Sequence, residues 1–111
     1  MTNRTPENYN WEKLEFKNML LPSHLYNKGR AGHKIEYFTI HHMIILDNQT
    51  RDESPLVACR NVWVNGRQAS AHYGVSGDFV GQYVWDNDTA FANANLESNR
   101  RTIAVEHANK T

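Results

Sequence analysis

Two adjacent histidines and one glutamate are the residues of this chain best suited to chemistry. His41 and His42 lie in the apolar stretch IEYFTIHHMII, residues 35–45, and Glu106 lies in the alternating segment TIAVEH, residues 102–107. An imidazole can bind a metal ion or move a proton, and a buried carboxyl has the raised pKa that suits a general acid or base. These residues are therefore the first candidates for a functional site.

The two histidines differ in the face of the strand that they occupy. Successive side chains of a strand point to opposite faces, so an undistorted strand cannot direct both imidazoles at one metal ion. His42 shares a strongly apolar face with Phe38 and Ile40, which is typical of a core or supporting histidine. His41 shares the more polar face with Tyr37 and is the better candidate for chemistry.

Glu106 lies between Ala104 and Ala108 on one face of its strand, where small neighbours leave room for a ligand. Buried there, its carboxyl would have a raised pKa and could act as a general acid or base. The alternative is an exposed edge glutamate, or one paired with Arg100 or Arg101. Spacing alone favours that alternative, because charged residues are mostly exposed.

Two other candidate nucleophiles do not fit. Cys59 lies on the apolar stripe of a predicted helix, where a free cysteine usually acts as a small hydrophobic residue. The string GVSG at residues 74–77 is one residue short of a nucleophile elbow, which excludes the serine-hydrolase reading.

The elements that position these residues are predicted to be a mixture of strands and helix. The segments with strand patterns are residues 35–45, 69–75, 79–85 and 102–107. The first is read as a buried central strand, and the next two as a hairpin. Ser54-Pro55 predicts the start of a helix that Gly66 can close. Residues 11–21 fit helix or strand equally, and residues 86–99 are expected to be a polar loop.

Length and composition limit the architecture and the partners. The 111 residues suit one domain, with residues 1–10 expected to be flexible. Twelve basic residues balance twelve acidic ones, which argues against nucleic acid as a partner. The longest apolar run, residues 43–46, is too short to cross a membrane, and the N-terminus has no secretory signal pattern. A single cysteine excludes a disulfide framework.

Several blocks of the sequence together resemble a known family. They are YFTIHHM (37–43), RQASAHYGVSGDFVGQYV (67–84), DNDTAF (86–91) and NRRTIAVEHAN (99–109). In this order and spacing they resemble the zinc-dependent N-acetylmuramoyl-L-alanine amidases, the family shared by phage endolysins, bacterial autolysins and peptidoglycan-recognition proteins. The details look closest to endolysins of phages that infect Gram-positive bacteria.

The resemblance implies an α/β fold with a central mixed β-sheet flanked by helices. It also implies hydrolysis of the amide between N-acetylmuramic acid and L-alanine in bacterial peptidoglycan. By position in the family motifs, His41 is expected to bind Zn2+ and Glu106 to be the catalytic acid and base, which reverses the preference for an exposed glutamate. The segment from Ser70 to Tyr73 and the loop around Phe91 are expected to line the substrate groove.

The chain departs from the family pattern in two places. Ala92 stands where many relatives have a histidine. The family's other zinc ligands lie in a later segment, whereas this sequence ends at Thr111, so His41 is the single family ligand position present. We therefore expect residues 1–111 to be an amidase domain truncated at its C-terminus, with exposed apolar surface, that associates with a missing C-terminal half or a second chain.

The expected function is thus that of an endolysin-like enzyme, made in the cytoplasm without a signal peptide and acting on the cell wall after release. One alternative is a non-catalytic peptidoglycan-binding module or an inactive fragment of such an amidase, which the missing ligands favour. Another is a structural domain that shares only the strand pattern. Its signature would be an exposed Glu106 far from His41.

Overall fold

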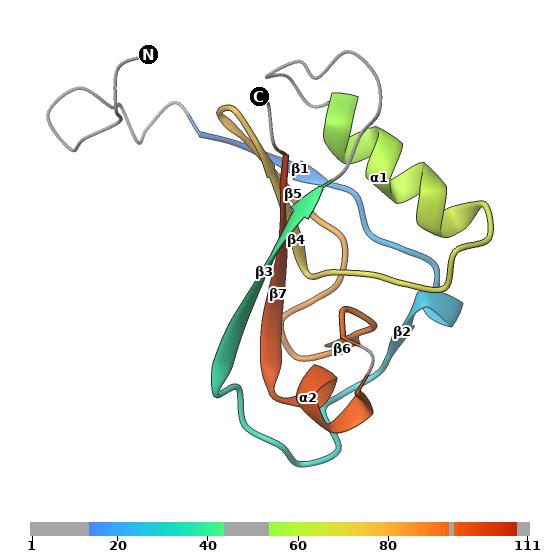
Figure 1. Cartoon of the computed structure of the whole chain (residues 1–111), viewed down its shortest axis with the longest axis vertical. Coiled ribbons are helices and arrows are strands. Elements are labelled where there is room, and N and C mark those ends of the chain that lie inside the picture. The colour runs from blue at the N-terminus through green and yellow to red at the C-terminus, as the bar shows by residue number, and fades with distance from the viewer. Residues whose placement is uncertain (1–13, 44–53, 94, 109–111) are drawn as a thin grey trace, which may run out of the picture.

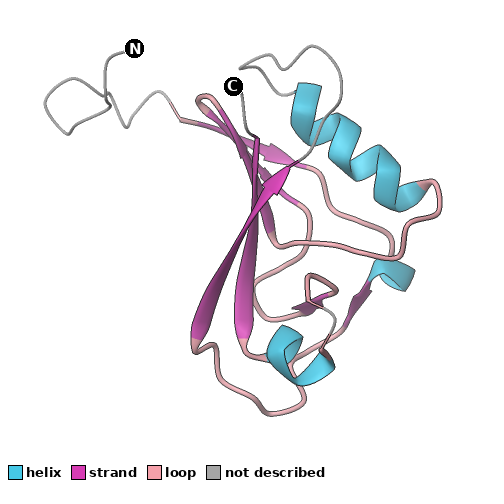
Figure 2. Cartoon of the chain, in the orientation of Figure 1, coloured by secondary structure: helices cyan, strands magenta, loops and turns pink. Residues whose placement is uncertain are grey.

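A five-stranded mixed sheet carries the candidate residues. The computed structural model describes residues 14–43, 54–93 and 95–108. The strands of this sheet are β1 (Glu15–Asn18), β3 (Tyr37–Met43), β4 (Tyr73–Ser76), β5 (Phe79–Gln82) and β7 (Thr102–Ala108), in the order β1-β5-β4-β7-β3. Helix α1 (Ser54–Val64) lies along one side of the sheet (Figures 1 and 2). The predicted α/β class with a mixed sheet is confirmed.

The smaller elements lie at the lower end of the sheet in Figure 1. They are a single 3₁₀ turn (Ser23–Leu25), a two-stranded ladder of β2 (Tyr26–Asn27) with β6 (Thr89–Ala90), and the short helix α2 (Leu96–Arg100). None of the helices in the described ranges is long and apolar enough to cross a bilayer.

The pairing of the strands explains why the sheet is mixed. Strands β4 and β5 form the predicted hairpin, which turns at Gly77 with a φ of +56°. A positive φ costs glycine little, which suits this residue to the turn. The remaining pairs are parallel, and β7 lies between β4 and β3. The two strands that carry His41 and Glu106 are therefore direct neighbours.

Strand β3 corrects the prediction of a buried central strand. It forms an edge of the sheet, and the side chains of Phe38 and Ile40 are 76% and 69% exposed. Apolar, β-branched and aromatic residues predict a strand, but they do not specify its depth in the sheet. The side chain of His42 and residues 44–45 lie outside the described residues, so their predictions are not tested.

Helix α1 has the predicted start and end. Leu56 and Trp63 are buried against the sheet, while Val62 points outward and is 52% exposed. Gly66 follows the helix with a φ of +143°. The Arg60 guanidinium donates hydrogen bonds to the backbone carbonyls of residues 19 and 20, at 3.1 and 2.8 Å, and so fastens α1 to the segment that follows β1.

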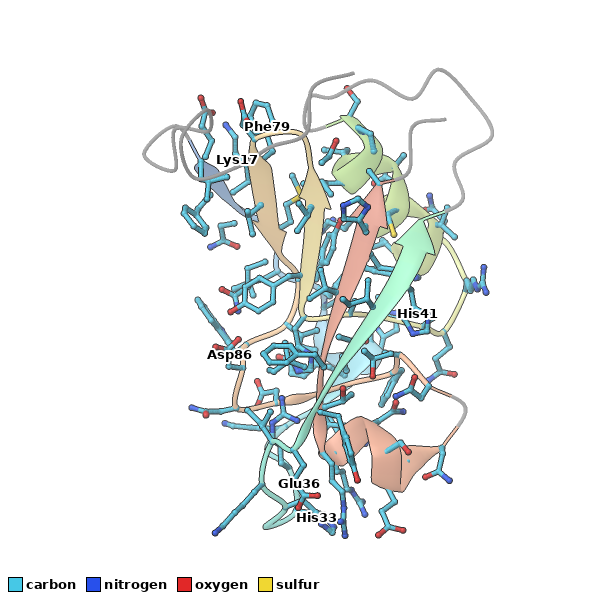
Figure 3. The ribbon with its side chains drawn as sticks, turned by 60° about the vertical axis from the view of Figure 1, so that its left-hand side comes forward. Lys17, His33, Glu36, His41, Phe79 and Asp86 are labelled. Carbon is cyan, nitrogen blue, oxygen red and sulfur yellow. The ribbon has the colours of Figure 1, made fainter. Side chains whose placement is uncertain are left out.

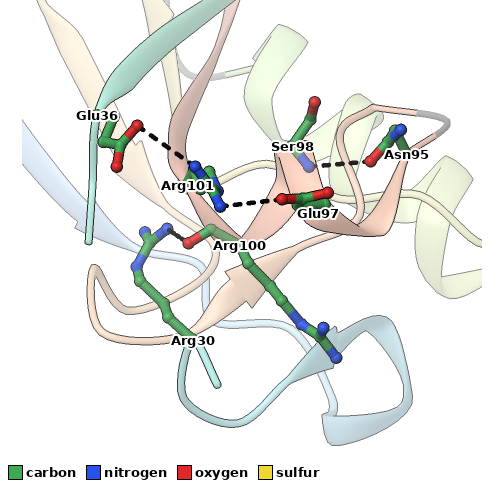
Figure 4. A network of polar contacts seen from close by, with 7 residues as sticks. All are labelled: Arg30, Glu36, Asn95, Glu97, Ser98, Arg100 and Arg101. Carbon is green, nitrogen blue, oxygen red and sulfur yellow. Dashed lines mark hydrogen bonds and ion pairs between the residues drawn. The ribbon is translucent and has the colours of Figure 1, made fainter. Parts of the chain in front are cut away.

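The structure assigns one segment that was left open and revises the prediction for another. Residues 11–21, left open between helix and strand, include β1. Residues 86–99, predicted to be a loop, include β6 and α2. The Asn95 side chain caps α2 by accepting a hydrogen bond from the Ser98 amide at 3.1 Å (Figure 4). A helix of this length depends on such local and tertiary contacts, because helix nucleation is unfavourable.

A buried polar cluster holds the loop after β5 against β7. Arg30 is 8% exposed and donates hydrogen bonds to the carbonyls of Asp86, Arg100 and Thr102 at 2.8, 3.1 and 2.9 Å. Its contact with the Arg100 carbonyl is drawn in Figure 4. These bonds satisfy a charged group that would otherwise be expensive to bury.

His72 is fully buried in the same cluster. Its Nδ1 accepts the Ala104 amide hydrogen at 3.1 Å, so the neutral ring carries its hydrogen on Nε2 and donates it to the Asp88 carbonyl at 2.8 Å. Arg30 also lies 3.1 Å from Nε2, but both nitrogens then carry hydrogens, so this is a contact rather than a hydrogen bond. Burial first, and the Arg30 charge to a smaller degree, lower the pKa of His72.

The face of the sheet away from α1 is not covered by any element in the described ranges. We call it the bare face; its side chains include Phe16, Phe38, Ile40, Val75, Val80 and Val105. Phe16 is 73% exposed, and Phe38 and Ile40 are similarly open. The expectation of exposed apolar surface is therefore confirmed.

Candidate functional site

His41 and Glu106 are direct register partners on the parallel strands β3 and β7. Neighbouring strands lie about 4.8 Å apart, and laterally paired residues project to the same face of a sheet. The side chains of His41 and Glu106 therefore lie next to each other on one side of the sheet. Figure 3 shows His41 projecting from β3.

The same lateral row continues through two glycines, Gly74 on β4 and Gly81 on β5. A Cβ atom added to Gly74 would lie 2.8 Å from Leu56 Cδ2, which belongs to α1. The row of His41, Glu106 and the glycines therefore faces α1. The helix approaches closely because no side chain separates it from the two central strands.

The environment of Glu106 is that of a partly buried acid. Burial raises the pKa of its carboxyl, and the charges of His41 and Arg67 oppose that rise. The alternative pairing with Arg101 does not occur: that guanidinium lies 2.9 Å from Glu97 and 3.6 Å from Glu36. A carboxyl with a raised pKa can both accept and return a proton.

His41 carries an unsatisfied nitrogen. Its Nε2 is buried and has no hydrogen-bond partner among the described residues. Buried polar atoms nearly always have a partner, so this nitrogen is suited to a ligand or donor from outside the described residues. One imidazole nitrogen of this kind fits the part of a single metal ligand.

The described residues do not form a complete zinc site. Catalytic zinc is usually held by three protein ligands. In the part of the chain that the structure describes, no group of three or more His, Cys, Asp or Glu side chains is placed to hold a metal ion. His41 fits as one ligand, and the rest of a zinc site would have to come from elsewhere.

Two residues, Cys59 and Tyr83, belong to the surroundings of Glu106, which the sequence analysis did not predict. Cys59 on α1 is half-buried, and burial first and the Glu106 charge second raise the pKa of its thiol to about 12. A protonated thiol is a poor nucleophile, in agreement with its exclusion above. The Tyr83 hydroxyl is fully buried and donates to the Leu56 carbonyl at 2.8 Å. In the sequence, the alternation of Gly74 and Gly81 with larger residues was the signal that could have indicated these contacts.

Tyr73 does not join this cluster. It pairs with Val105 on β7, so its side chain lies on the face opposite Glu106, where its hydroxyl donates to Asp86 Oδ1 at 2.5 Å. Ser70, in the same predicted groove segment, is buried, and its hydroxyl donates to the Leu25 carbonyl at 2.6 Å. The part of this segment in substrate binding stays a prediction.

Phe91 follows β6 and is half-buried. Its amide donates to the Ser70 hydroxyl at 2.8 Å, and its carbonyl accepts from the Ser70 amide at 3.0 Å. These bonds fix the backbone of Phe91, while its part in substrate binding stays a prediction.

Comparison with known proteins gives a structural likeness. No family model and no curated protein matches the sequence. A mutant endolysin from Bacillus subtilis matches with a TM-score of 0.63 at 19% identity, over 86% of this chain and 61% of the endolysin chain. The Staphylococcus aureus hydrolase AmiA, solved with its ligand, matches with a TM-score of 0.61 at 16% identity, over 87% of this chain and 45% of that chain.

This chain therefore spans less than two thirds of the length of either structure. At these identities, the likeness establishes the fold: an α/β sheet architecture similar to that of an endolysin and of the hydrolase AmiA.

Proposed function

We propose that this chain is the His41- and Glu106-bearing part of a peptidoglycan hydrolase of the N-acetylmuramoyl-L-alanine amidase kind. The observation that carries the proposal is the register pairing of His41 with Glu106 on the side of the sheet that α1 covers. The fold, similar to that of an endolysin and of AmiA, supports it. The substrate class is the muramyl peptide of the cell wall, rather than nucleic acid or membrane.

In this proposal, Glu106 performs the proton transfers. One carboxylate oxygen accepts a proton from water as the water oxygen bonds to the lactyl carbonyl carbon. The same carboxyl returns the proton to the L-alanine nitrogen as the carbon–nitrogen bond breaks, leaving a carboxylic acid and a free amine. Partial burial raises the pKa of Glu106 and so strengthens its carboxylate as the base that accepts the proton from water.

His41 would hold Zn2+ as one ligand through its unsatisfied Nε2. A bound zinc ion would supply a water of lowered pKa and polarise the scissile carbonyl. The other ligands would come from outside the described residues, through a C-terminal half or a second chain. The exposed bare face supports such an association, because apolar surface of this kind commonly marks an interface.

We further propose that the enzyme acts on the wall after release from the cytoplasm in which it is made.

The experiment that tests the catalytic proposal combines metal analysis with hydrolysis. The purified 111-residue chain is dialysed against trace zinc, and its zinc content is measured. Its hydrolysis of muramyl peptide is measured as the appearance of the free amino group of L-alanine. We expect about one zinc per chain where a second chain completes the site, and loss of that zinc in His41→Ala.

Glu106→Gln is the matched variant, since it keeps the size of the side chain and removes its proton exchange. We expect it to keep the zinc and to lower hydrolysis by about 10² to 10⁴-fold. Loss of zinc in Glu106→Gln with unchanged hydrolysis by the remaining metal-loaded fraction would contradict the assigned part of this residue.

The second candidate is a non-catalytic peptidoglycan-binding module. The absence of a three-ligand group among the described residues favours it. A module of this kind would sediment with purified peptidoglycan, retain no zinc and release no amine. Amine release that depends on Glu106 would exclude it.

A further inference from the structure

Helix α1 rests on the glycine row with little clearance. A Cβ atom at Gly74 would lie 2.8 Å from Leu56 Cδ2, 2.8 Å from the Tyr83 hydroxyl oxygen and 2.9 Å from Tyr83 Cε2. Real Cβ atoms essentially never come so close to other heavy atoms, so the helix or the tyrosine ring would have to move. Gly74 is the register partner of Glu106, so that movement would occur beside the carboxyl.

Tyr83 connects the sheet to both ends of α1. Its hydroxyl donates to the carbonyl of Leu56, in the first turn of the helix, at 2.8 Å. Its ring meets the Trp63 ring, in the last turn, edge to face with centroids 4.9 Å apart. Both aromatic side chains are buried. One side chain therefore fixes the height and the tilt of the helix over the sheet.

The groups that α1 brings to Glu106 depend on this placement. The Glu106 charge raises the pKa of the Cys59 thiol, in the middle of α1, and the charge of Arg67, after α1, opposes the rise in the Glu106 pKa. The Glu106 charge also raises the pKa of Tyr83, the residue that follows β5. The Glu106 carboxyl is thus half-buried beneath α1 and the residues that follow it.

We propose that Gly74 and Tyr83 are positioning residues that seat α1 against the sheet and so control the access of water to the Glu106 carboxyl. The inference rests on the proposed function in giving Glu106 a part in proton transfer. The seat itself is a matter of packing, and it can be tested without metal, substrate or activity. Neither residue is itself assigned to the reaction.

Cys59 provides the test, because it is the single cysteine of the sequence and lies on the sheet side of α1. The rate of its reaction with an excess of a disulfide reagent is measured on the 111-residue chain at fixed pH, well below the denaturation midpoint. We expect Gly74→Ala to raise this rate about tenfold, since overpacking a close contact makes local opening easier.

Gly81→Ala is the matched control. It lies in the same row, but its Cβ would meet the flexible Met19 Sδ at 3.1 Å and Leu56 Cδ1 at 3.4 Å, so side-chain adjustment suffices. We expect less than about a threefold rise for this variant, a fraction of the overpacking effect. A second control, Thr89→Ala, removes the hydrogen bond from Thr89 to the Gly29 carbonyl and destabilises the fold away from α1.

Should Gly74→Ala fail to fold, Tyr83→Phe tests the same proposal. It keeps the ring contact with Trp63 and removes only the hydrogen bond to Leu56, and we expect a rise of about threefold. The proposal that Gly74 and Tyr83 seat α1 would be overturned if Cys59 were labelled no faster in Gly74→Ala than in Gly81→Ala. Labelling of Cys59 in Tyr83→Phe at the wild-type rate would also overturn it. So would equal labelling in Thr89→Ala at matched stability. A catalytically silent Glu106 would refute the proposed function and leave the seat standing.

Discussion

The two faces of the sheet differ in a way that their hydrophobicity does not explain. The face under α1 includes two glycines, Gly74 and Gly81, and the polar pair of His41 and Glu106. The bare face includes large apolar side chains such as Phe38, which is 76% exposed. The more apolar face is thus the one left open by the described elements.

The difference shows that helix docking here depends on shape. A helix can approach a sheet closely where glycines leave room for its side chains, and Leu56 fills that room completely, at 0% exposure. On the bare face, bulky side chains would hold a helix further away. Hydrophobic patterning predicts which residues share a face, but the glycines decide which face α1 covers.

The largest expected effect comes from truncating one side chain on each face of the sheet. Leu56→Ala should lower the free energy of unfolding by about 2–5 kcal/mol, because it empties a fully buried position. Phe38→Ala, on the bare face, should change it by less than about 0.5 kcal/mol. Urea denaturation of both variants measures the difference. Similar losses in the two variants would show that the bare face is covered.

Acid should destabilise the covered side through His72. Burial lowers its pKa in the folded state below the unfolded value of about 6.5, so the folded state binds fewer protons than the unfolded state. The contribution of His72 is therefore complete above about pH 6.5 and is lost as the pH falls from there toward the lowered pKa. Denaturation midpoints between pH 7 and 5 measure this loss.

One variant isolates the effect. His72→Gln does not titrate and should be less stable at pH 7 but should lose less stability on acidification. An unchanged acid profile in His72→Gln would assign the effect to other groups.

Glu106 should show the opposite sign. Its pKa is raised in the folded state, mainly by burial, so its contribution favours folding at low pH and is lost as the pH rises through the folded pKa. The free energy of unfolding of Glu106→Gln at pH 7 should therefore equal or exceed that of the wild type. The gain should not exceed about 1 kcal/mol, because solvent partly screens the carboxyl. Lower stability of the variant at pH 7, by thermal denaturation, would contradict this sign.

A small change in stability is also expected when the bare face itself is made polar. The double variant Phe38→Ser, Ile40→Ser should leave the free energy of unfolding within about 1 kcal/mol of wild type, because both side chains are largely exposed. It should bind less of a fluorescent hydrophobic dye than the wild type. Equal dye binding would place the accessible apolar surface elsewhere.

The sequence predicted the individual strands and helices better than it predicted which strands pair with one another. Regular alternation identified β7, and Gly77 identified the hairpin. The parallel register between His41 and Glu106 follows from no local pattern, because it depends on β7 entering the sheet beside β3. The choice of His41 by its more polar face and of Glu106 by its small neighbours nevertheless named two residues that are register partners.

The missed features have physical causes. Helix α2 is too short for a periodic pattern, and Asn95 is as common in turns as in helix caps. Tyr73 was expected to line the substrate groove, and alternation along β4 directs its side chain to the face opposite Glu106. The exposure of β3 depends on where α1 docks, which is a property of the assembled sheet.

The position of β7 has a consequence for how the protein comes to be folded. Strand β3 and the β4–β5 hairpin precede β7 in the chain, yet within the described sheet they are joined only through it. The contact between Tyr37 and Thr102 spans 65 residues, and contacts of such separation form slowly. A nascent chain that has not yet added β7 therefore has no paired His41 and Glu106, and any activity of that pair begins only with this last strand.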